Sequence, residues 1–316
     1  MNNTGAATAL MLTKGVGRKA LFDLMQKVSA DDLVDLVEHP ARLTQDGGMS
    51  ESMARGVAGS LLQSERIQQE LDDMGVVTLT IRDESYPDRL RHVLGRDAPP
   101  VLFAIGNLEL LTQPSVGFCG ARKASEKGVR VATEASALLA KEGIVLVSGY
   151  ASGVDLSVHQ GALQAGGATI FVLAEGISHF RIKAGVKPLL SHENHLVLSE
   201  FPPGLPWMAR SAMQRNSTII GLSDAMVVIE SGLTGGTYAC GRSTMEYGRP
   251  LFVADYAVPA NSAEGNRYFL ERGALPLRGN RQGTPNIARV LTAIRQPGET
   301  PSPRSKGRTL FPVDPP

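Results

Sequence analysis

The sequence predicts an α/β protein whose main domain is a Rossmann-like, doubly wound and mainly parallel sheet, with a small N-terminal helical domain before it. Two observations lead to this fold class. From about residue 115, short and continuously apolar runs alternate with segments of helical spacing, which is typical of a sheet covered on both faces by crossover helices. Glycines follow many of the apolar runs, and small residues in such turns let phosphates approach backbone N–H groups.

The composition is that of an ordinary globular protein, with 42% hydrophobic and 20% charged residues among 316. Cys119 and Cys240 are far apart, which excludes a disulfide framework or a CxxC zinc site and favours a reducing compartment, the cytoplasm. The N-terminus lacks the apolar region of a secretory signal, and the apolar runs are far shorter than the ~20 residues of a membrane helix. A net charge of +1 neither requires nor excludes a nucleic-acid partner.

Residues 1–72 are expected to form the helical domain, because ALFDLMQKV and DLVDLVEH repeat apolar residues at helical spacing. Between them and the start of the chain, residues 13–18 form a Gly-x-Gly turn that enters a helix. Such a turn can clamp a DNA phosphate, as in a helix-hairpin-helix unit, or it can be a plain turn in a small bundle. We favour the plain turn, since short glycine motifs match often by chance.

Residues 73–286 are expected to form the extended Rossmann-like domain. VVTLTI and VLFAIG predict two strands, separated by a short helix that Pro99 and Pro100 end. Further apolar runs predict strands at residues 115–120, 144–149, 169–174, 195–200, 225–230 and 250–255. The remaining residues, 287–316, are rich in Pro, Arg, Ser and Gly, so we expect a disordered tail that is dispensable for folding.

Ligands of a doubly wound sheet bind outside the carboxyl ends of its strands. Arg122 is the strongest candidate, because an arginine just after a strand can hold a phosphate with two donors, and Lys123 and Ser125 share its turn. The predicted DNA- or phosphate-binding residues are Gly120, Ala121, Arg122, Lys123, Ser125, Ser148, Gly149, Gly153, Lys183, Arg215, Asn216, Gly235, Gly236 and Thr237. Arg215 and Asn216 could hold a phosphate or could buttress the loops, and both interpretations stay open.

Asp155 and His159 are four residues apart on one predicted helix, so they can pair as an acid–base couple. A structural role is favoured, with Asp155 capping the helix start and His159 orienting it. His192, Glu193 and His195 could suggest a metal, but we interpret them as loop and strand-entry residues because no further ligands stand at metal spacing. No catalytic residue, metal or cofactor is predicted.

Several motifs, in this order, resemble the DprA/Smf family of DNA-processing proteins from about residue 5 to 285. YPDRLRHVLGRDAPPVLFAIGN is similar to the family's tyrosine-proline segment, and VGFCGARKAS to its glycine-serine-arginine turn, with Ala121 in place of the serine. VSGYASGVDLSVHQGAL is similar to its next strand and helix. SEFPPG, RNSTIIGLSDAMVVIE, MEYGRP and EGNRYFLERGA follow in the family's order.

The resemblance implies a single-stranded DNA binder, usually a homodimer, that loads a RecA-type recombinase during DNA uptake, recombination or defence against mobile elements. It implies no catalysis, no cofactor and no membrane, and a divergent member without a winged-helix module. The Gly-Gly-Thr loop at Gly235 also resembles phosphoribohydrolases that activate cytokinins, so the alternative is a sensor or enzyme for nucleotides or nucleotide sugars. That enzyme motif needs a nearby glutamate, and Glu246 follows Thr237 by nine residues, which argues for binding over catalysis.

Overall fold

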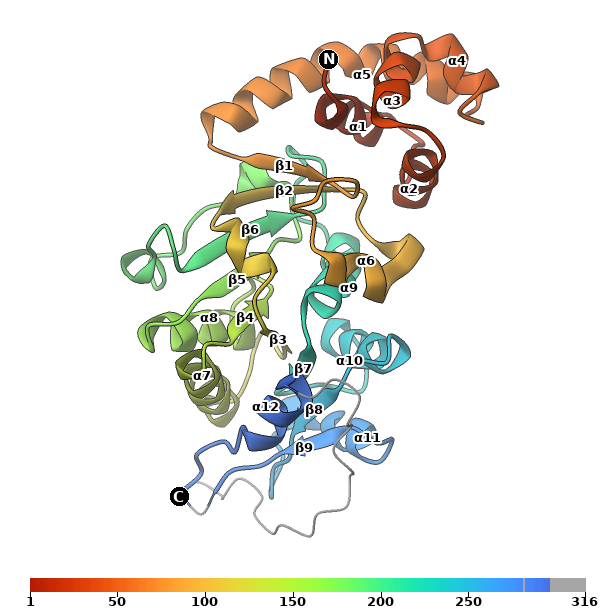
Figure 1. The fold of residues 1–316 in the computed structure, drawn as a ribbon. Helices are drawn as coiled ribbons and strands as arrows, with labels where there is room; N and C mark the ends of the chain where they lie inside the picture. The colour runs from red at the N-terminus through yellow and green to blue at the C-terminus, as the bar shows by residue number, and fades with distance from the viewer. Residues whose placement is uncertain (281, 296–316) are drawn as a thin grey trace. The chain divides into compact units, whose positions relative to one another are not determined.

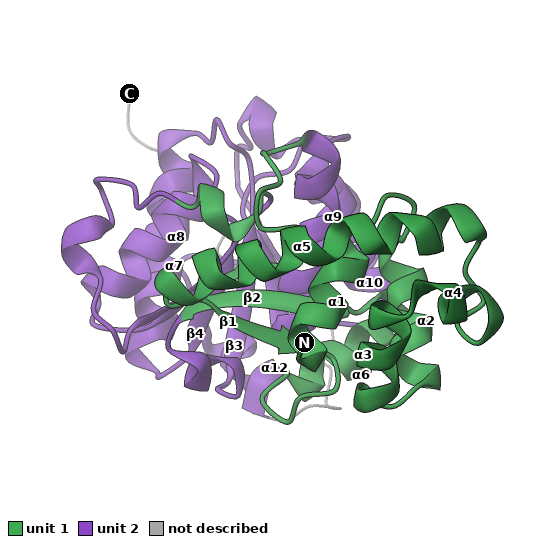
Figure 2. Ribbon diagram, turned by 90° about the horizontal axis from the view of Figure 1, so that it is seen from above, with its two compact units in different colours: residues 1–105, 175–180, 198–208 green, residues 106–174, 181–197, 209–316 purple. Residues whose placement is uncertain are grey.

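The computed structural model describes residues 1–280 and 282–295, which divide into two compact units (Figures 1 and 2). Unit 1 holds residues 1–105, 175–180 and 198–208, and unit 2 holds 106–174, 181–197 and the described residues from 209 onward. Unit 1 thus extends beyond the boundary that the sequence placed at residue 72. Whether residues 1–72 fold as a domain of their own stays a prediction.

Unit 1 is mainly helical. Its helices are α1 (Asn3–Leu12), α2 (Arg18–Lys27), α3 (Ala30–Glu38), α4 (Pro40–Gln45), α5 (Glu51–Asp73) and α6 (Asp88–Leu94). Helix α3 begins where it does because Ser29 and Asp32 form a capping box, in which the Asp32 N–H donates to the Ser29 hydroxyl over 3.0 Å. After the helices, β1 (Val77–Thr80) pairs antiparallel with β2 (Val101–Gly106).

The Gly-x-Gly turn of unit 1 leads into a helix whose first residue contacts other residues of the same unit. Gly15 takes the left-handed conformation at φ 93°, and Gly17 is the N-cap of α2. The first residue of α2, Arg18, forms a 2.9 Å ion pair with Glu200, whose side chain is fully buried, and also donates to the Asp97 carbonyl. These contacts favour the plain turn, because the arginine beside the glycines neutralises a buried carboxylate of the protein itself.

Unit 2 contains the parallel sheet. Its strands are β3 (Ser115–Cys119), β4 (Val145–Ser148), β5 (Thr169–Val172), β6 (His195–Ser199, whose end belongs to unit 1), β7 (Ala225–Val228), β8 (Leu251–Ala254) and β9 (Leu275–Leu277). Its helices are α7 (Glu126–Lys141), α8 (Val154–Gln164), α9 (Ala209–Leu222), α10 (Gly236–Glu246), α11 (Asn266–Leu270) and α12 (Ala288–Arg295). Within the described residues, the strands form a nine-stranded sheet in the order β1-β2-β6-β5-β4-β3-β7-β8-β9.

The predicted fold class is confirmed. Strand β3 pairs in parallel with β4 and with β7, and parallel pairing continues from β4 to β5 and from β7 through β8 to β9. Each of the eight predicted strands is present within a residue or two of its expected bounds. The sequence missed β9, since this edge strand has only three residues and its middle one is Pro276, which gives no strand signal.

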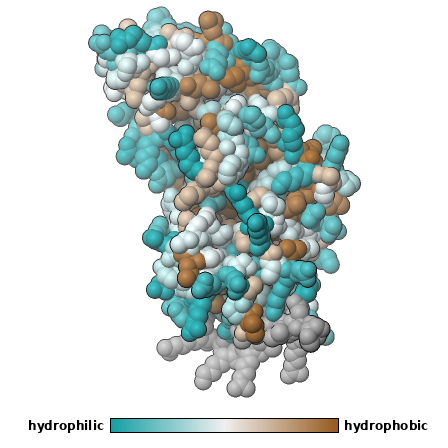
Figure 3. Space-filling model, turned by 180° about the vertical axis from the view of Figure 1, so that it is seen from behind, coloured by the Kyte–Doolittle hydropathy of each residue, from teal (hydrophilic) through white to brown (hydrophobic). Residues whose placement is uncertain are grey.

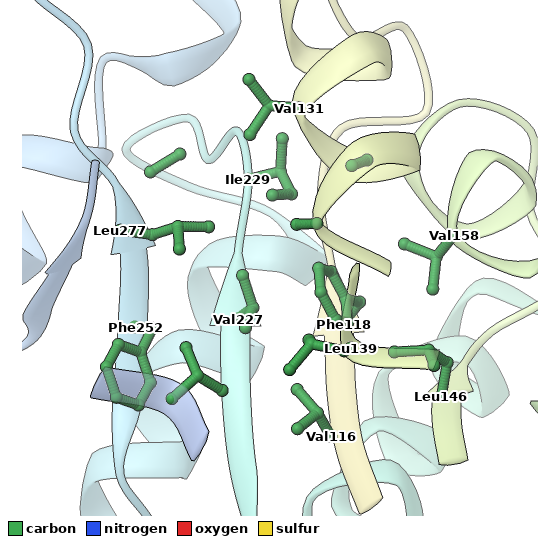
Figure 4. Packing of buried hydrophobic residues seen from close by; sticks show 14 of the residues in the cluster. Val116, Phe118, Val131, Leu139, Leu146, Val158, Val227, Ile229, Phe252 and Leu277 are labelled. Atoms are coloured by element: carbon green, nitrogen blue, oxygen red, sulfur yellow. The ribbon is translucent and has the colours of Figure 1, made fainter. Parts of the chain in front are cut away.

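Apolar side chains on both faces of β3 explain why its run is continuously hydrophobic. On one face, Val116 and Phe118 pack with Val131 of α7 and Val158 of α8 (Figure 4). On the other face, Gly117 leaves room for α9, because a Cβ there would lie 3.1 Å from the Ile219 side chain and closer still to Met226. Burial on both faces is the feature of parallel sheets on which the sequence prediction rested.

The predicted disordered tail begins too early. Residues 288–295 form α12, and Val290 and Ala293 are buried in the same core cluster as Val116 and Phe118. The polar and proline-rich composition of the following residues concealed a short amphipathic helix at the front of the segment. Residues 296–316, the rest of the predicted tail, lie outside the described residues.

The surface drawn in Figure 3 is mostly hydrophilic, with hydrophobic side chains in small groups. The most exposed large hydrophobic residues come from different elements and include Leu62, Val258 and Met213. Among residues 1–280 and 282–295, no helix combines the length and hydrophobicity that crossing a membrane requires.

The burial of α12 yields a stability prediction. Val290→Ala removes two methyl groups from a fully buried position, so we expect it to lower the free energy of unfolding by about 2 kcal/mol. Thr292→Ala, on the exposed side of the same helix, should change it by less than about 0.5 kcal/mol. Urea unfolding measures both, and equal, negligible effects would contradict the packing of α12.

Candidate functional site

The candidate site lies in unit 2, where loops follow the carboxyl ends of β3, β4 and β7. Because these strands are parallel neighbours, their ends meet at one edge of the sheet; Cys119, the last residue of β3, pairs with Val228, the last of β7. Two of the predicted loops therefore start side by side. This edge is where doubly wound proteins bind ligands.

Glycines pack the loop after β3 against the start of α8. A Cβ on Gly120 would lie 2.7 Å from the Cβ of Val154, and a Cβ on Gly153 would lie 2.7 Å from the carbonyl carbon of Arg122. Gly153 also has φ 79°, and the Val154 N–H donates to the Ala121 carbonyl over 3.3 Å. These glycines thus give close contact between protein segments, and they fix the backbone that carries Arg122.

Arg122 and Lys123 are exposed at the turn after β3. Both residues follow the carboxyl end of β3, and the backbone around them contacts the start of α8; their phosphate contact stays a prediction. Because the fold already fixes this backbone, the loop needs no further ordering when Arg122 contacts a ligand. The arrangement suits an anion that approaches from solvent.

Ser125 lies at the end of the same turn, but its polar atoms are already engaged. Its hydroxyl accepts the Gly128 N–H over 3.0 Å as the N-cap of α7 and donates to Glu230. The Ser125 N–H also donates to Glu230, over 2.9 Å. The phosphate contact predicted for Ser125 would therefore have to displace one of these bonds.

The loop after β4 is built around the buried carboxylate of Asp155, with the buried guanidinium of Arg215 near it. Asp155 accepts from the Ser148 hydroxyl over 3.1 Å and from the Ala151 N–H over 3.3 Å, both in the loop before α8, so the prediction that it caps this helix is wrong. Burial raises the pKa of Asp155, and the nearby positive charge of Arg215 opposes that rise. Both side chains press on Gly149, where a Cβ would overlap the guanidinium and the carboxylate. Ser148 and Gly149 thus support this pair directly.

His159 takes partners other than Asp155, so the predicted orienting contact is not the one present. Its Nε2 lies 2.6 Å from the Gly149 carbonyl and its Nδ1 lies 2.7 Å from the Thr169 hydroxyl. Since a carbonyl oxygen can only accept, Nε2 carries the proton. Burial lowers the pKa of His159 to about 3, which keeps the ring neutral.

Arg215 is buried, with an exposed fraction of only 7%. This burial favours the buttressing role over direct contact with a DNA strand. It donates to the Val172 carbonyl at the end of β5. Its neighbour Asn216 donates to the Gly236 carbonyl over 3.2 Å and so braces the start of α10. The two adjacent residues of α9 thereby support two different loops.

The loop before α10 is open, unlike those after β3 and β4. Gly235 has φ 89°, and apart from the adjacent residues and the backbone of α10 itself, no atom of the described residues lies within 4 Å of a Cβ built on Gly235 or Gly236. Gly235 is the N-cap of α10, and within the part of the chain that the structure describes no side chain caps this helix. The first N–H groups of α10, which include that of Thr237, have no side-chain cap, and with the positive end of the helix dipole they favour an anion here.

Lys183 lies against Tyr150, a residue that the sequence analysis gave no role. Its Nζ donates to the Tyr150 carbonyl over 2.6 Å and lies 4.3 Å from the centre of the ring, while its N–H donates to the phenol oxygen over 2.7 Å. These contacts hold the segment around Lys183 over the loop after β4. The sequence does contain a signal for both missed residues. Tyr150 is a large side chain just after an apolar run, and Glu230 is a charged one at the end of another.

In residues 1–280 and 282–295, no group of three or more His, Cys, Asp or Glu side chains is placed to hold a metal ion. Cys119 and Cys240 are both buried and unoxidised. Contact with Cys240 and burial raise the pKa of the Cys119 thiol, which disfavours a reactive thiolate.

Comparison with known proteins gives one consistent family. The family model described as DNA recombination-mediator protein A matches residues 77–284. The DNA processing protein DprA of Streptococcus pneumoniae is 35% identical over 199 residues, which cover 62% of this chain and 69% of that protein. The protein Smf of Escherichia coli is 32% identical over 194 residues, covering 61% of this chain and 51% of that protein.

Solved structures agree with these sequence relatives. The structure of DprA from Streptococcus pneumoniae aligns with a TM-score of 0.71 at 25% identity and covers 88% of this chain and 95% of that one. DprA from Helicobacter pylori, whose structure is described as giving insight into a unique single-stranded DNA binding mode, aligns with a TM-score of 0.54 at 27% identity. That alignment covers 64% of this chain and 90% of the other.

The neutral, buried His159 predicts a pH dependence. Between the ordinary pKa of 6.5 and about 3, the unfolded chain binds a proton at this position that the folded chain refuses. The contribution of His159 to the free energy of unfolding therefore decreases as pH falls, by up to about 1.4 kcal/mol per pH unit. His159→Gln cannot bind that proton, so its stability deficit relative to the natural sequence should shrink from pH 6 to pH 4 in urea unfolding. A constant deficit would contradict burial of a neutral ring.

Proposed function

This chain belongs to the DNA recombination-mediator protein A family of DprA and Smf proteins, and from that premise we propose that it binds single-stranded DNA at the carboxyl edge of its parallel sheet. Its role is DNA processing of the DprA type. The observation that supports a DNA site is that two loops begin side by side, because the strands before them, β3 and β7, are paired. One carries exposed Arg122 and Lys123, and the other carries the open glycines before α10.

This site suits a sugar-phosphate backbone. Arginine, lysine and uncapped backbone N–H groups all recognise phosphate, and none of them reads a base sequence. The ligand class is supported by the relative from Helicobacter pylori, whose structure concerns single-stranded DNA binding. We propose that Lys183, held beside Tyr150, and Thr237, in the first turn of α10, extend the same phosphate path.

We propose further that the protein acts by binding, in the cytoplasm, and loads a RecA-type recombinase as a homodimer. The resemblance of the motifs and the family's description as a recombination mediator support this. Glu246, the nearest glutamate after the Gly-Gly-Thr loop, is at the far end of α10 and pairs with Arg242 over 3.0 Å, an arrangement that does not favour the hydrolase alternative. Recombinase filament growth on coated single strands, with and without this protein, tests the loading step.

Loss of Arg122 is the sharpest test of the strand site. Arg122→Ala should weaken binding of a labelled single-stranded oligonucleotide by about 1.5 kcal/mol or more, roughly tenfold, because a charged hydrogen bond to phosphate is lost. The slope of log affinity against log salt should become shallower by about 0.7 per phosphate contact removed. Arg267→Ala, which removes another exposed arginine, one of α11 that pairs with Glu271, is the matched control and should bind normally.

Arg215→Ala should behave differently from Arg122→Ala. Removing a buried guanidinium leaves Asp155 buried without its positive neighbour, so we expect about 3 kcal/mol or more of lost stability. Melting temperature and affinity measured together separate the two effects. If Arg122→Ala binds like the natural sequence while folded Arg215→Ala has lost binding, the strand follows a different path from the one proposed.

A further inference from the structure

The start of α7 is the position where a Rossmann-like protein would hold the phosphate of a small nucleotide. Helix α7 follows β3 through the glycine-containing turn, and its first N–H groups and dipole favour an anion there. In this chain the place is not open.

A side chain of the protein occupies this position. Glu230, at the end of the β7 segment, is fully buried and accepts from the Ser125 N–H over 2.9 Å and from the Ser125 hydroxyl. The Ser262 hydroxyl donates to the same carboxylate over 2.6 Å. On the helix side, Gly128 packs directly on the carboxyl group, where a Cβ would lie 2.6 Å from the carboxyl carbon.

These donors form the arrangement that a phosphate would need. A backbone N–H and two hydroxyls converge on two oxygens at a helix start, and the carboxylate supplies the negative charge that the dipole favours. A phosphate brought to the same place would lose these donors and would meet a like charge away from water, which is strongly unfavourable. Glu230 thus has the chemistry of an internal substitute for the anion.

We propose that Glu230 is a specificity-determining residue that fills the phosphate position at α7 and so excludes free nucleotides and nucleotide sugars from it. The start of α8 is similar, since Asp155 lies buried in its first turn beside Arg215. At the start of α10, by contrast, the first turn contains no acidic residue and Gly235 is exposed. Phosphates of a strand are therefore directed to Arg122 and the α10 loop.

The test is a gain of binding in Glu230→Ala, with inorganic phosphate as the probe. Removing the carboxylate should free the Ser125 and Ser262 donors, so calorimetric titration should show phosphate affinity at least ~10-fold tighter than for the natural sequence. Phosphate should also raise the melting temperature of the variant saturably, with chloride at equal ionic strength as the comparison. Glu230→Ala combined with Ser125→Ala should lose the gain.

Val290→Ala controls for the general stabilisation that phosphate gives any weakened protein. If folded Glu230→Ala binds phosphate no better than the natural sequence, Glu230 is only a structural residue and the proposal fails. If Glu230→Ala does not fold in chloride, recovery of cooperative unfolding in phosphate supports the proposal, and no recovery overturns it. The assay contains no DNA, so this proposal can fail or succeed independently of the proposed binding of single-stranded DNA.

Discussion

Parallel pairing of β3 with both β4 and β7 is the constraint on which the rest of the structure depends. It brings the ends of three strands to one edge, so segments more than a hundred residues apart in sequence contribute to one set of loops. It also requires crossover helices on both faces, which bury the sheet and start at the same edge. The fold thus creates several helix N-termini next to one another before any particular ligand is specified.

The chain satisfies these helix starts in different ways. The buried Glu230 accepts from the Ser125 N–H at the start of α7, whereas the buried Asp155, in the first turn of α8, bonds to the loop after β4 and lies near Arg215 of α9. Such buried groups are costly unless every partner is present, so the loops after β3 and β4 are held in one arrangement. His159 adds two hydrogen bonds without adding a charge. Loops held by these buried contacts then carry the exposed basic residues Arg122 and Lys123.

The strands could be predicted from the sequence because apolar periodicity reports burial directly, and burial on two faces has few structural explanations. The sequence did not predict β9, because Pro276 interrupts its apolar run. It did not predict α12 because the residues that follow this short helix are polar and rich in proline. The candidate site was harder to predict. Gly153 and Gly235 look alike in sequence, yet one packs on Arg122 and the other faces open space. Likewise, the buried setting of Arg215 depends on residues that are distant in sequence.

The contact between Gly128 and Glu230 limits how this sequence can change over time. Any side chain at position 128 would overlap the carboxyl group, because even a Cβ there would stand 2.6 Å from its carbon. A mutation of Gly128 is therefore harmful while glutamate remains at 230, and it becomes tolerable only after that residue has been shortened. A substitution at 230 can precede one at 128, but the reverse order is blocked. Related sequences that keep Glu230 should therefore also keep Gly128.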